Sequence, residues 1–186
     1  MTKTKTNALA NYMNYYLKYL YNSGHKQSKE LAAFRSSLNI NDPRMVKCYA
    51  KLFGNIPETF LSTSGTPTYA ENAIFLATKC YAILQQSNDN CAYNSTYDKT
   101  LFKVLHNIRL DPKLQSGLDR RVINVLQTAN SFAYVQSALP QLIRILKSNT
   151  NGLSINFTEL ALDLYKMQFT NQSVQQIILL WGQQYY

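Results

Sequence analysis

The sequence predicts an all-α protein of two small helical bundles with no sheet. Nearly every segment of its 186 residues repeats apolar side chains with the period of a helix, about 3.6 residues. The alternating runs bounded by Asn-Gly or Gly-Gly turns that are typical of β-hairpins do not occur. Hydrophobic residues make up 46% of the chain, which is enough to form a core.

Four helices are expected in the first half of the chain, each delimited by residues that start or stop helices. Gly24 supplies the left-handed position that commonly follows a helix C-terminus. Pro43 suits a first helical turn, where no backbone N–H is needed. The stretch 54–67, which contains Gly, Pro and Ser, is expected to be a loop. The four helices are expected at residues 7–21, from Ser28, from Pro43, and at residues 67–86.

The helix that begins at Ser28 is the first with a basic side chain set apart from its apolar face. The hydroxyl of Ser28 is expected to cap its first turn. Leu31, Phe34 and Leu38 fall on one stripe and are expected to face the core. Arg35 lies off this stripe, so we expect it to point toward solvent or a ligand.

A linker is predicted at residues 87–96, SNDNCAYNST, which are polar and turn-prone with almost nothing to bury. The chain is therefore divided into an N-terminal helical bundle, residues 1–96, and a C-terminal one, residues 97–186. Pro140 is expected to break or kink its helix, because proline lacks the N–H that the helix needs. Helices of the second half are expected at residues 99–108, at 112–129, as an interrupted pair over 131–148, from Phe157, and from Ser173.

The charge of the chain indicates an acidic partner. The net charge is +9 although only 16% of the residues are charged. From Lys99 to Lys147 there are eight Lys and Arg against two Asp, a net charge of +6 in this segment. Such a region attracts phosphates over a long range, although solubility alone is the competing explanation.

Two helices of the second half separate basic from apolar side chains. On the first, Val122, Ile123, Val125 and Leu126 share one side, opposite Arg120, Arg121, Asn124 and Gln127. On the second, Leu142, Ile143, Ile145 and Leu146 oppose Arg144 and Lys147. A solvated face is the simpler explanation. Displayed arginines among amides nevertheless favour a nucleic-acid backbone, because a guanidinium holds two phosphate oxygens at once.

No enzyme is expected from the sequence. It lacks the GxSxG, Walker and HExxH motifs and carboxylate pairs at a catalytic spacing. Cys48, Cys80 and Cys91 have no CxxC spacing, and His25 and His106 lie far from them in sequence. We therefore expect no disulfide, no metal and no cofactor.

A cytoplasmic location is expected for this chain. Its first residues, MTKTKTNALA, lack the apolar core of a signal peptide, and no run of about 18 apolar residues could span a membrane.

Six segments of the chain resemble, in the same order, those of the CasB family, the small subunit of the type I-E CRISPR Cascade complex. They are ELAAFRSSL, TPTYAENAIFLATKCYAIL, LDRRVINVLQTA, LPQLIRILKSN, INFTELALDLYKM and VQQIILLWGQQYY. The resemblance implies a two-lobed, all-helical, non-catalytic protein of antiviral defence. Such a protein sits as a pair beside the backbone and large subunits. It helps to hold the guide RNA, the target DNA of the R-loop and the displaced strand.

The resemblance also implies which residues bind nucleic acid. By motif, the basic groove residues of the family fall on Arg35, Lys103, Arg120, Arg121 and Arg144. Lys147 is added because it lies beside Arg144 on the helical wheel. Thr68 stands where relatives can carry a basic residue, and Trp181 is interpreted as a packing anchor.

Two other functions remain open at this stage. The chain could be a purely structural docking subunit whose cations neutralise an acidic partner. It could also be a helical DNA-binding regulator, although the short gap TANS before Ser131 fits a helix-turn-helix only loosely.

Overall fold

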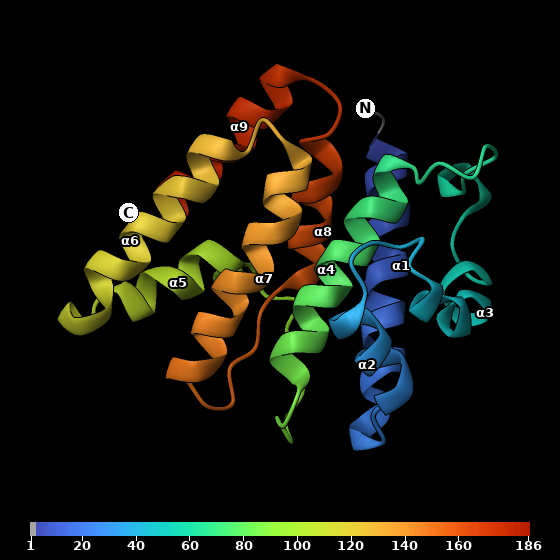
Figure 1. The fold of residues 1–186 in the computed structure, drawn as a ribbon, viewed down its shortest axis with the longest axis horizontal. Helices are drawn as coiled ribbons and strands as arrows, with labels where there is room; N and C mark the ends of the chain where they lie inside the picture. Colours follow the sequence, from blue (N-terminus) through green and yellow to red (C-terminus); the bar gives the residue numbers. More distant parts are fainter. Residues whose placement is uncertain (1–2) are drawn as a thin grey trace.

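The protein is all-α over residues 3–186, the part described in this computed structural model: helices are joined by turns and irregular segments (Figure 1). No strand forms among these residues, and their one β-bridge pairs Tyr93 with Ile155. The all-α prediction is therefore confirmed. The α-helices are α1 (Lys3–Tyr21), α2 (Ser28–Ser36), α3 (Tyr49–Phe53), α4 (Tyr69–Gln85), α5 (Leu101–Arg109), α6 (Pro112–Thr128), α7 (Phe132–Asn149), α8 (Phe157–Lys166) and α9 (Asn171–Tyr185).

Helix α4 is the centre of the fold. Its sequence, YAENAIFLATKCYAILQ, is apolar around most of its circumference, and all but two of its residues are buried. A helix that is hydrophobic on all sides needs neighbours on all sides. Helices α1, α2, α7 and α8 supply them. At its start Thr68 and Glu71 form a capping box, in which each side chain accepts from the other's backbone N–H.

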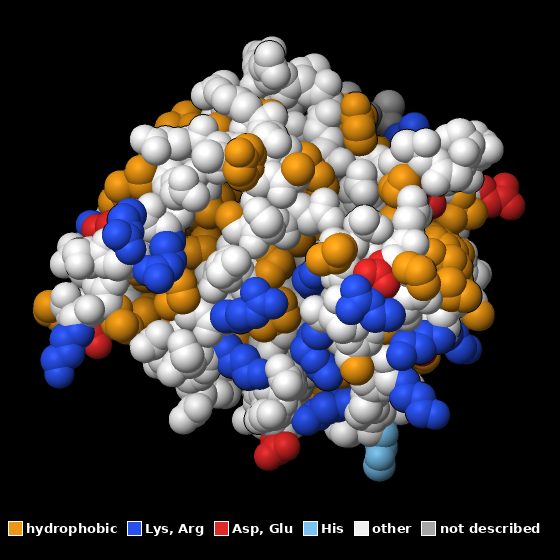
Figure 2. Space-filling view, viewed as in Figure 1, with side chains coloured by type: hydrophobic (Ala, Val, Ile, Leu, Met, Phe, Trp, Pro, Cys, Tyr) orange, Lys and Arg blue, Asp and Glu red, His pale blue; other side chains and the backbone are white. Residues whose placement is uncertain are grey.

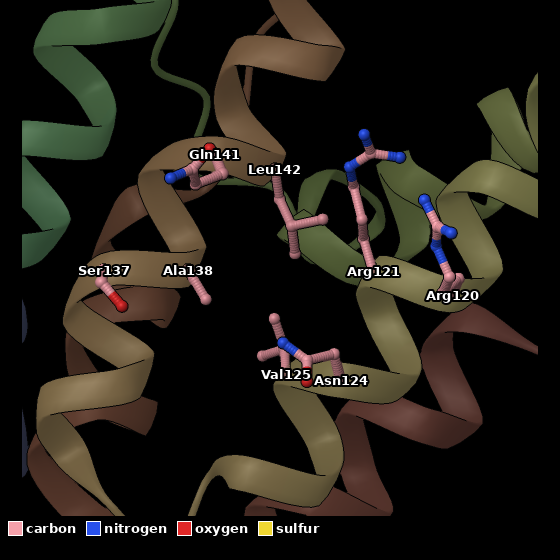
Figure 3. Close-up of a pocket in the computed structure, with 8 residues that line it drawn as sticks. All are labelled: Arg120, Arg121, Asn124, Val125, Ser137, Ala138, Gln141 and Leu142. Atoms are coloured by element: carbon pink, nitrogen blue, oxygen red, sulfur yellow. The ribbon is translucent and has the colours of Figure 1, made fainter.

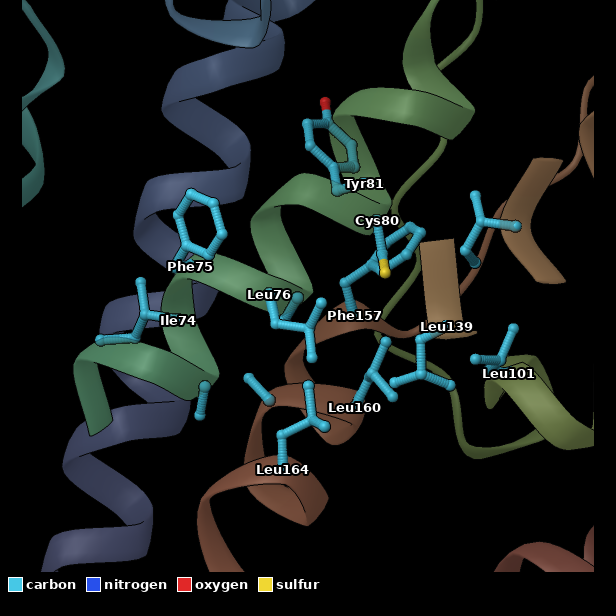
Figure 4. Close-up of a cluster of buried hydrophobic side chains, with 14 of the residues drawn as sticks. Ile74, Phe75, Leu76, Cys80, Tyr81, Leu101, Leu139, Phe157, Leu160 and Leu164 are labelled. Carbon is cyan, nitrogen blue, oxygen red and sulfur yellow. The ribbon is translucent and has the colours of Figure 1, made fainter. Parts of the chain in front are cut away.

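Helix α8 comes late in the chain but packs against the first helices. It contacts α1 and α4, and Figure 4 shows its residues Phe157, Leu160 and Leu164 beside the apolar side chains of α4. A single cluster of buried apolar residues extends from α1 to α9. The segment 87–96 is irregular, as predicted. The division of the chain after residue 96 stays a prediction.

Helices α5, α6 and α9 pack against one another, and α7 joins them to α4. Trp181 on α9 is 1% exposed, and its ring stacks on Phe102 of α5 with 4.7 Å between centroids. Its Nε1–H donates to the Asp163 carboxylate of α8 at 2.8 Å. The predicted role of Trp181 as a packing anchor is consistent with these contacts.

Three local expectations are wrong. Pro140 does not break its helix: it lies inside the continuous helix α7, where its burial beside Leu139 and Ile143 offsets the lost backbone hydrogen bond. Leu38 is 72% exposed, because the extended backbone of Ser37 ends the stripe of α2 before reaching it. Ser28 lies inside the first turn of α2, and its hydroxyl donates to the carbonyl of Lys26, so it does not cap the helix.

The other predicted helix positions are close to the observed ones. Pro43 starts a 3-10 helix, Pro43–Cys48, that continues into α3. Gly24 adopts the expected left-handed backbone, with φ of +97°. None of the described helices is long and apolar enough to cross a membrane.

Candidate nucleic-acid interface

Two hollows on one face of the molecule contain most of the basic residues that the sequence predicted. The α6–α7 hollow has a volume of about 470 Å³ and lies between α6 and α7 (Figure 3). It is lined by Arg120, Arg121, Asn124, Val125, Ser137, Ala138, Gln141 and Leu142. Its polar groups are therefore arginines, amides and a hydroxyl, with no carboxylate among them.

The α2–α7 hollow, of about 560 Å³, brings together basic residues that are far apart in sequence. Arg35 from α2 faces Arg144 and Lys147 from α7 across this space. The lining is completed by Ala32, Ser36, Ile83, Gln86 and Ser148. Three cations and no acid thus meet in one concave site.

The phase of each helix explains why these cations face outward. In α6 the buried residues Leu118, Val122 and Val125 recur three or four positions apart, and Arg120 and Arg121 lie on the exposed side. The prediction for Ile123 is wrong, because this residue is 42% exposed. It follows Val122 by one position, which turns its side chain about 100° away from the buried stripe.

None of the five cations in the two hollows forms an ion pair with a carboxylate of the described chain. The pairs that do form are Lys26–Asp89, Arg44–Asp42, Lys103–Asp98 and Arg109–Asp119. The cations of the hollows meet neutral oxygens: Arg121 donates to the Gly117 carbonyl at 3.0 Å, and Lys147 to the Gln86 amide at 3.1 Å. Their positive charge is therefore available to an anion.

Mutual repulsion and burial make the α2–α7 hollow electrostatically unfavourable when it holds no anion. Partial burial lowers the pKa of Lys147, and the nearby charge of Arg35 lowers it further. Burial also lowers the pKa of the Arg35 guanidinium, which donates to the Ala82 carbonyl at 3.4 Å. A bound phosphate would relieve this repulsion, because opposite charge favours the protonated forms.

Lys79 is a further cation near this hollow that the sequence reasoning missed. It is 9% exposed, and its ammonium donates to the Ser37 carbonyl. Burial lowers its pKa, and the charges of Arg144 and Arg44 act in the same direction. The signal in the sequence was a single lysine in the apolar run IFLATKCYAIL. The buried ammonium of Lys79 adds positive charge beneath the surface near the α2–α7 hollow.

Two residues singled out in the sequence lie apart from the hollows. Lys103 on α5 lines neither of them, and its ammonium is 3.4 Å from the Asp98 carboxylate. Thr68 caps α4 and donates its hydroxyl to the Phe60 carbonyl at 2.7 Å. The motif grouped Lys103 with the other basic residues, but in the folded chain Lys103 lies outside both hollows.

The surface around the hollows is basic over a wide area. Figure 2 shows Lys and Arg side chains across the lower half of this face, from α6 to α2, with few Asp and Glu among them. The upper part of the same face carries mainly uncharged side chains. An elongated anion fits this distribution better than a compact one.

Comparisons with known proteins identify the family. The family model described as CRISPR-associated protein Cse2 matches residues 30–186. The chain belongs to the Cse2 family. A crystal structure of CasB from Thermobifida fusca has the same fold, with a TM-score of 0.57 and 20% sequence identity. The match covers 85% of this chain and 94% of that one. No curated protein matches the chain.

Membership of the Cse2 family confirms the resemblance to CasB. It makes this chain a subunit of a multiprotein CRISPR Cascade complex. In this Cse2-family chain, five of the six predicted basic residues line the two hollows, and Lys103 does not.

Proposed function

We propose that this chain is a non-catalytic small subunit of a type I-E Cascade complex that binds nucleic-acid backbone. Its binding would be non-specific and would stabilise the R-loop between guide RNA and target DNA, together with the displaced strand, during antiviral defence in the cytoplasm. Its proposed partners are the backbone and large subunits, both nucleic acids and a second copy of the chain.

One observation carries this proposal. Five cations from three helices line two hollows on one face, and none of them is paired with a carboxylate of the described chain. Four of the five are arginines, whose planar fork matches two phosphate oxygens. Phosphate contacts fix position without reading sequence, which suits a complex in which base pairing with the guide supplies specificity.

The test is the salt dependence of DNA binding by the isolated chain. The triple variant Arg120→Gln, Arg121→Gln, Arg144→Gln should bind DNA more weakly than the native chain. The slope of log K against log salt should fall by roughly 0.7–0.9 for each lost phosphate contact, because each contact releases condensed counterions. A mobility-shift titration at several salt concentrations, with single-stranded and duplex DNA, measures both quantities.

A matched control removes the same charge elsewhere. The variant Lys5→Gln, Lys18→Gln, Lys51→Gln changes three exposed lysines of α1 and α3. It should keep a slope close to that of the native chain. A slope unchanged in the arginine variant would contradict the assignment of these residues. An isolated chain that binds no DNA in a salt-sensitive way would favour the docking-only subunit.

A further inference from the structure

The two hollows differ in their chemistry. The α2–α7 hollow brings together three cations from two helices, which suits phosphates. The α6–α7 hollow has an apolar part made by Val125, Ala138 and Leu142. Val125 and Leu142 are almost completely buried, at 2% and 1% exposure. These two residues form the floor of the hollow, and the partly exposed Ala138 is open to a ligand together with two amides and a hydroxyl, so this hollow suits a ligand with an uncharged part.

We propose that the α6–α7 hollow seats an unpaired nucleobase of the bound strand, while Arg120 and Arg121 hold the adjoining phosphates. This inference rests on the proposed function and adds that the bound nucleic acid is single-stranded. A base has flat apolar faces and a polar edge. The hollow offers the matching surfaces within about 470 Å³.

The apolar part of the hollow would cover the face of the base. Figure 3 shows the side chains of Val125 on α6 and of Ala138 and Leu142 on α7 directed into the space between the two helices. Seating a base there removes the apolar face of the base and the exposed part of Ala138 from water, which favours binding whatever the sequence. Ala138 is the smallest of the three and leaves the most room for the ligand.

The polar part of the lining would meet the edge of the base. Asn124 and Gln141 each carry an amide with both donors and an acceptor, and Ser137 adds a hydroxyl. Such groups can pair with the edge of any base by rotating, so they tolerate every sequence. The lining contains no carboxylate that would repel the neighbouring phosphates.

The two arginines stand where the strand would enter. Figure 3 shows Arg120 and Arg121 side by side on α6, with both guanidinium groups pointing the same way from one side of the hollow. Both are exposed, and the bond from Arg121 to the Gly117 carbonyl limits its rotation. Phosphates on either side of one nucleotide would lie within reach of these two groups.

The consequence is a preference for single strands. In a duplex every base is stacked and paired, so entry into the hollow would first require unstacking. A single strand has free bases. The α6–α7 hollow would therefore favour an opened strand over a duplex.

The experiment compares two oligomers with the same number of phosphates. Labelled oligothymidylate and an abasic oligomer of equal length are titrated with the full chain, and anisotropy is recorded at several salt concentrations. The native chain should bind oligothymidylate roughly fivefold more tightly, which corresponds to about 1 kcal/mol, the lower end of the range for stacking of a base on an aromatic side chain, because the hollow is lined by no aromatic residue. The slope of log K against log salt should be the same for the two oligomers, because their phosphate contacts are the same.

Variants that fill the hollow without changing charge complete the test. Ala138→Leu should abolish the difference between the oligomers and leave binding of the abasic one unchanged. Ser137→Leu, at an exposed position of the lining, should do the same if Ala138→Leu proves unstable. Ala133→Leu is the control, because Ala133 is exposed on α7 and does not line the hollow.

The outcomes separate this inference from the proposed function. Equal, salt-dependent affinity of the native chain for both oligomers would overturn the base site and leave backbone binding standing. Retention of the difference in both filled variants would also overturn it. If neither oligomer binds in a salt-dependent way, the proposed function fails and the base site fails with it.

Discussion

Asp163 should make the stability of this protein fall as the pH rises from about 4 to 7. The residue is 4% exposed, and one carboxylate oxygen accepts from Trp181 at 2.8 Å. The other oxygen is buried and has no hydrogen-bond partner in the described chain. Burial raises the pKa of Asp163 from 3.8 to about 6, although the Trp181 bond and the charge of Lys166 oppose this, while Glu159 adds to it.

The direction and size of the effect follow from that pKa. The folded chain holds the proton more tightly than the unfolded chain, so the contribution to stability is complete below about pH 4 and is lost as the pH rises through about 6. The rise in pKa from 3.8 to about 6 corresponds to a loss of roughly 3 kcal/mol. In a chain of this size, that lowers Tm by roughly 6–12 °C.

The assay is thermal unfolding of the native chain and of Asp163→Asn between pH 4 and 8 at constant ionic strength. The amide carbonyl of the variant can still accept from Trp181, but the side chain does not titrate. An unpaired NH2 group in the variant adds an offset that does not depend on pH, so the informative quantity is how the Tm difference changes with pH. That difference should shift in favour of the variant by several degrees between pH 4 and 7.5.

The control is Asp89→Asn, whose fully exposed carboxylate should give a nearly constant difference. A Tm difference between Asp163→Asn and the native chain that stays the same from pH 4 to 7.5 would refute the reasoning.

Two further predictions concern the scaffold of the hollows. Thr68→Ala should lower the free energy of unfolding, measured by urea titration, by roughly 1–2 kcal/mol, because the cap of α4 and the hydrogen bond to Phe60 are lost. Thr68→Ser keeps the hydroxyl and should retain most of the stability of the native chain. Phe102→Ala should lower the free energy of unfolding by roughly 3–5 kcal/mol, because it leaves a cavity against Trp181. Tyr134→Ala, at a position that is 61% exposed, should lower the same free energy by less than about 0.5 kcal/mol. An equal effect of the last two substitutions would contradict the packing described.

Much of the architecture could be predicted because helices carry their own local signals. The period of the apolar residues located the long helices, and Gly24, Pro43 and Pro112 marked ends and starts that the structure retains. The outward positions of Arg120, Arg121 and Arg144 also followed from helical phase, because the buried stripes of α6 and α7 fix the exposed sides.

Local signals failed at three residues, for different physical reasons. Pro140 reads as a helix breaker, but the burial of its neighbours keeps α7 continuous. Leu38 fits the stripe of α2 by spacing, but the helix has already ended at Ser36. Ile123 is apolar, but it follows Val122 by one position and so points about 100° away from the buried stripe. At Pro140 the surrounding elements override the local preference, whereas at Leu38 and Ile123 the end and the phase of the helix decide the exposure.

By itself, the sequence determined that the chain is helical, that its surface is strongly basic and which sides of α6 and α7 display arginine. The tertiary structure alone decided that Arg35 faces Arg144 and Lys147, that Lys103 lies apart from them, and that α8 packs against α1 and α4. The physical reason is that the phase of a helix specifies which side is buried but not which helix buries it. That choice depends on how complementary surfaces from distant segments pack together.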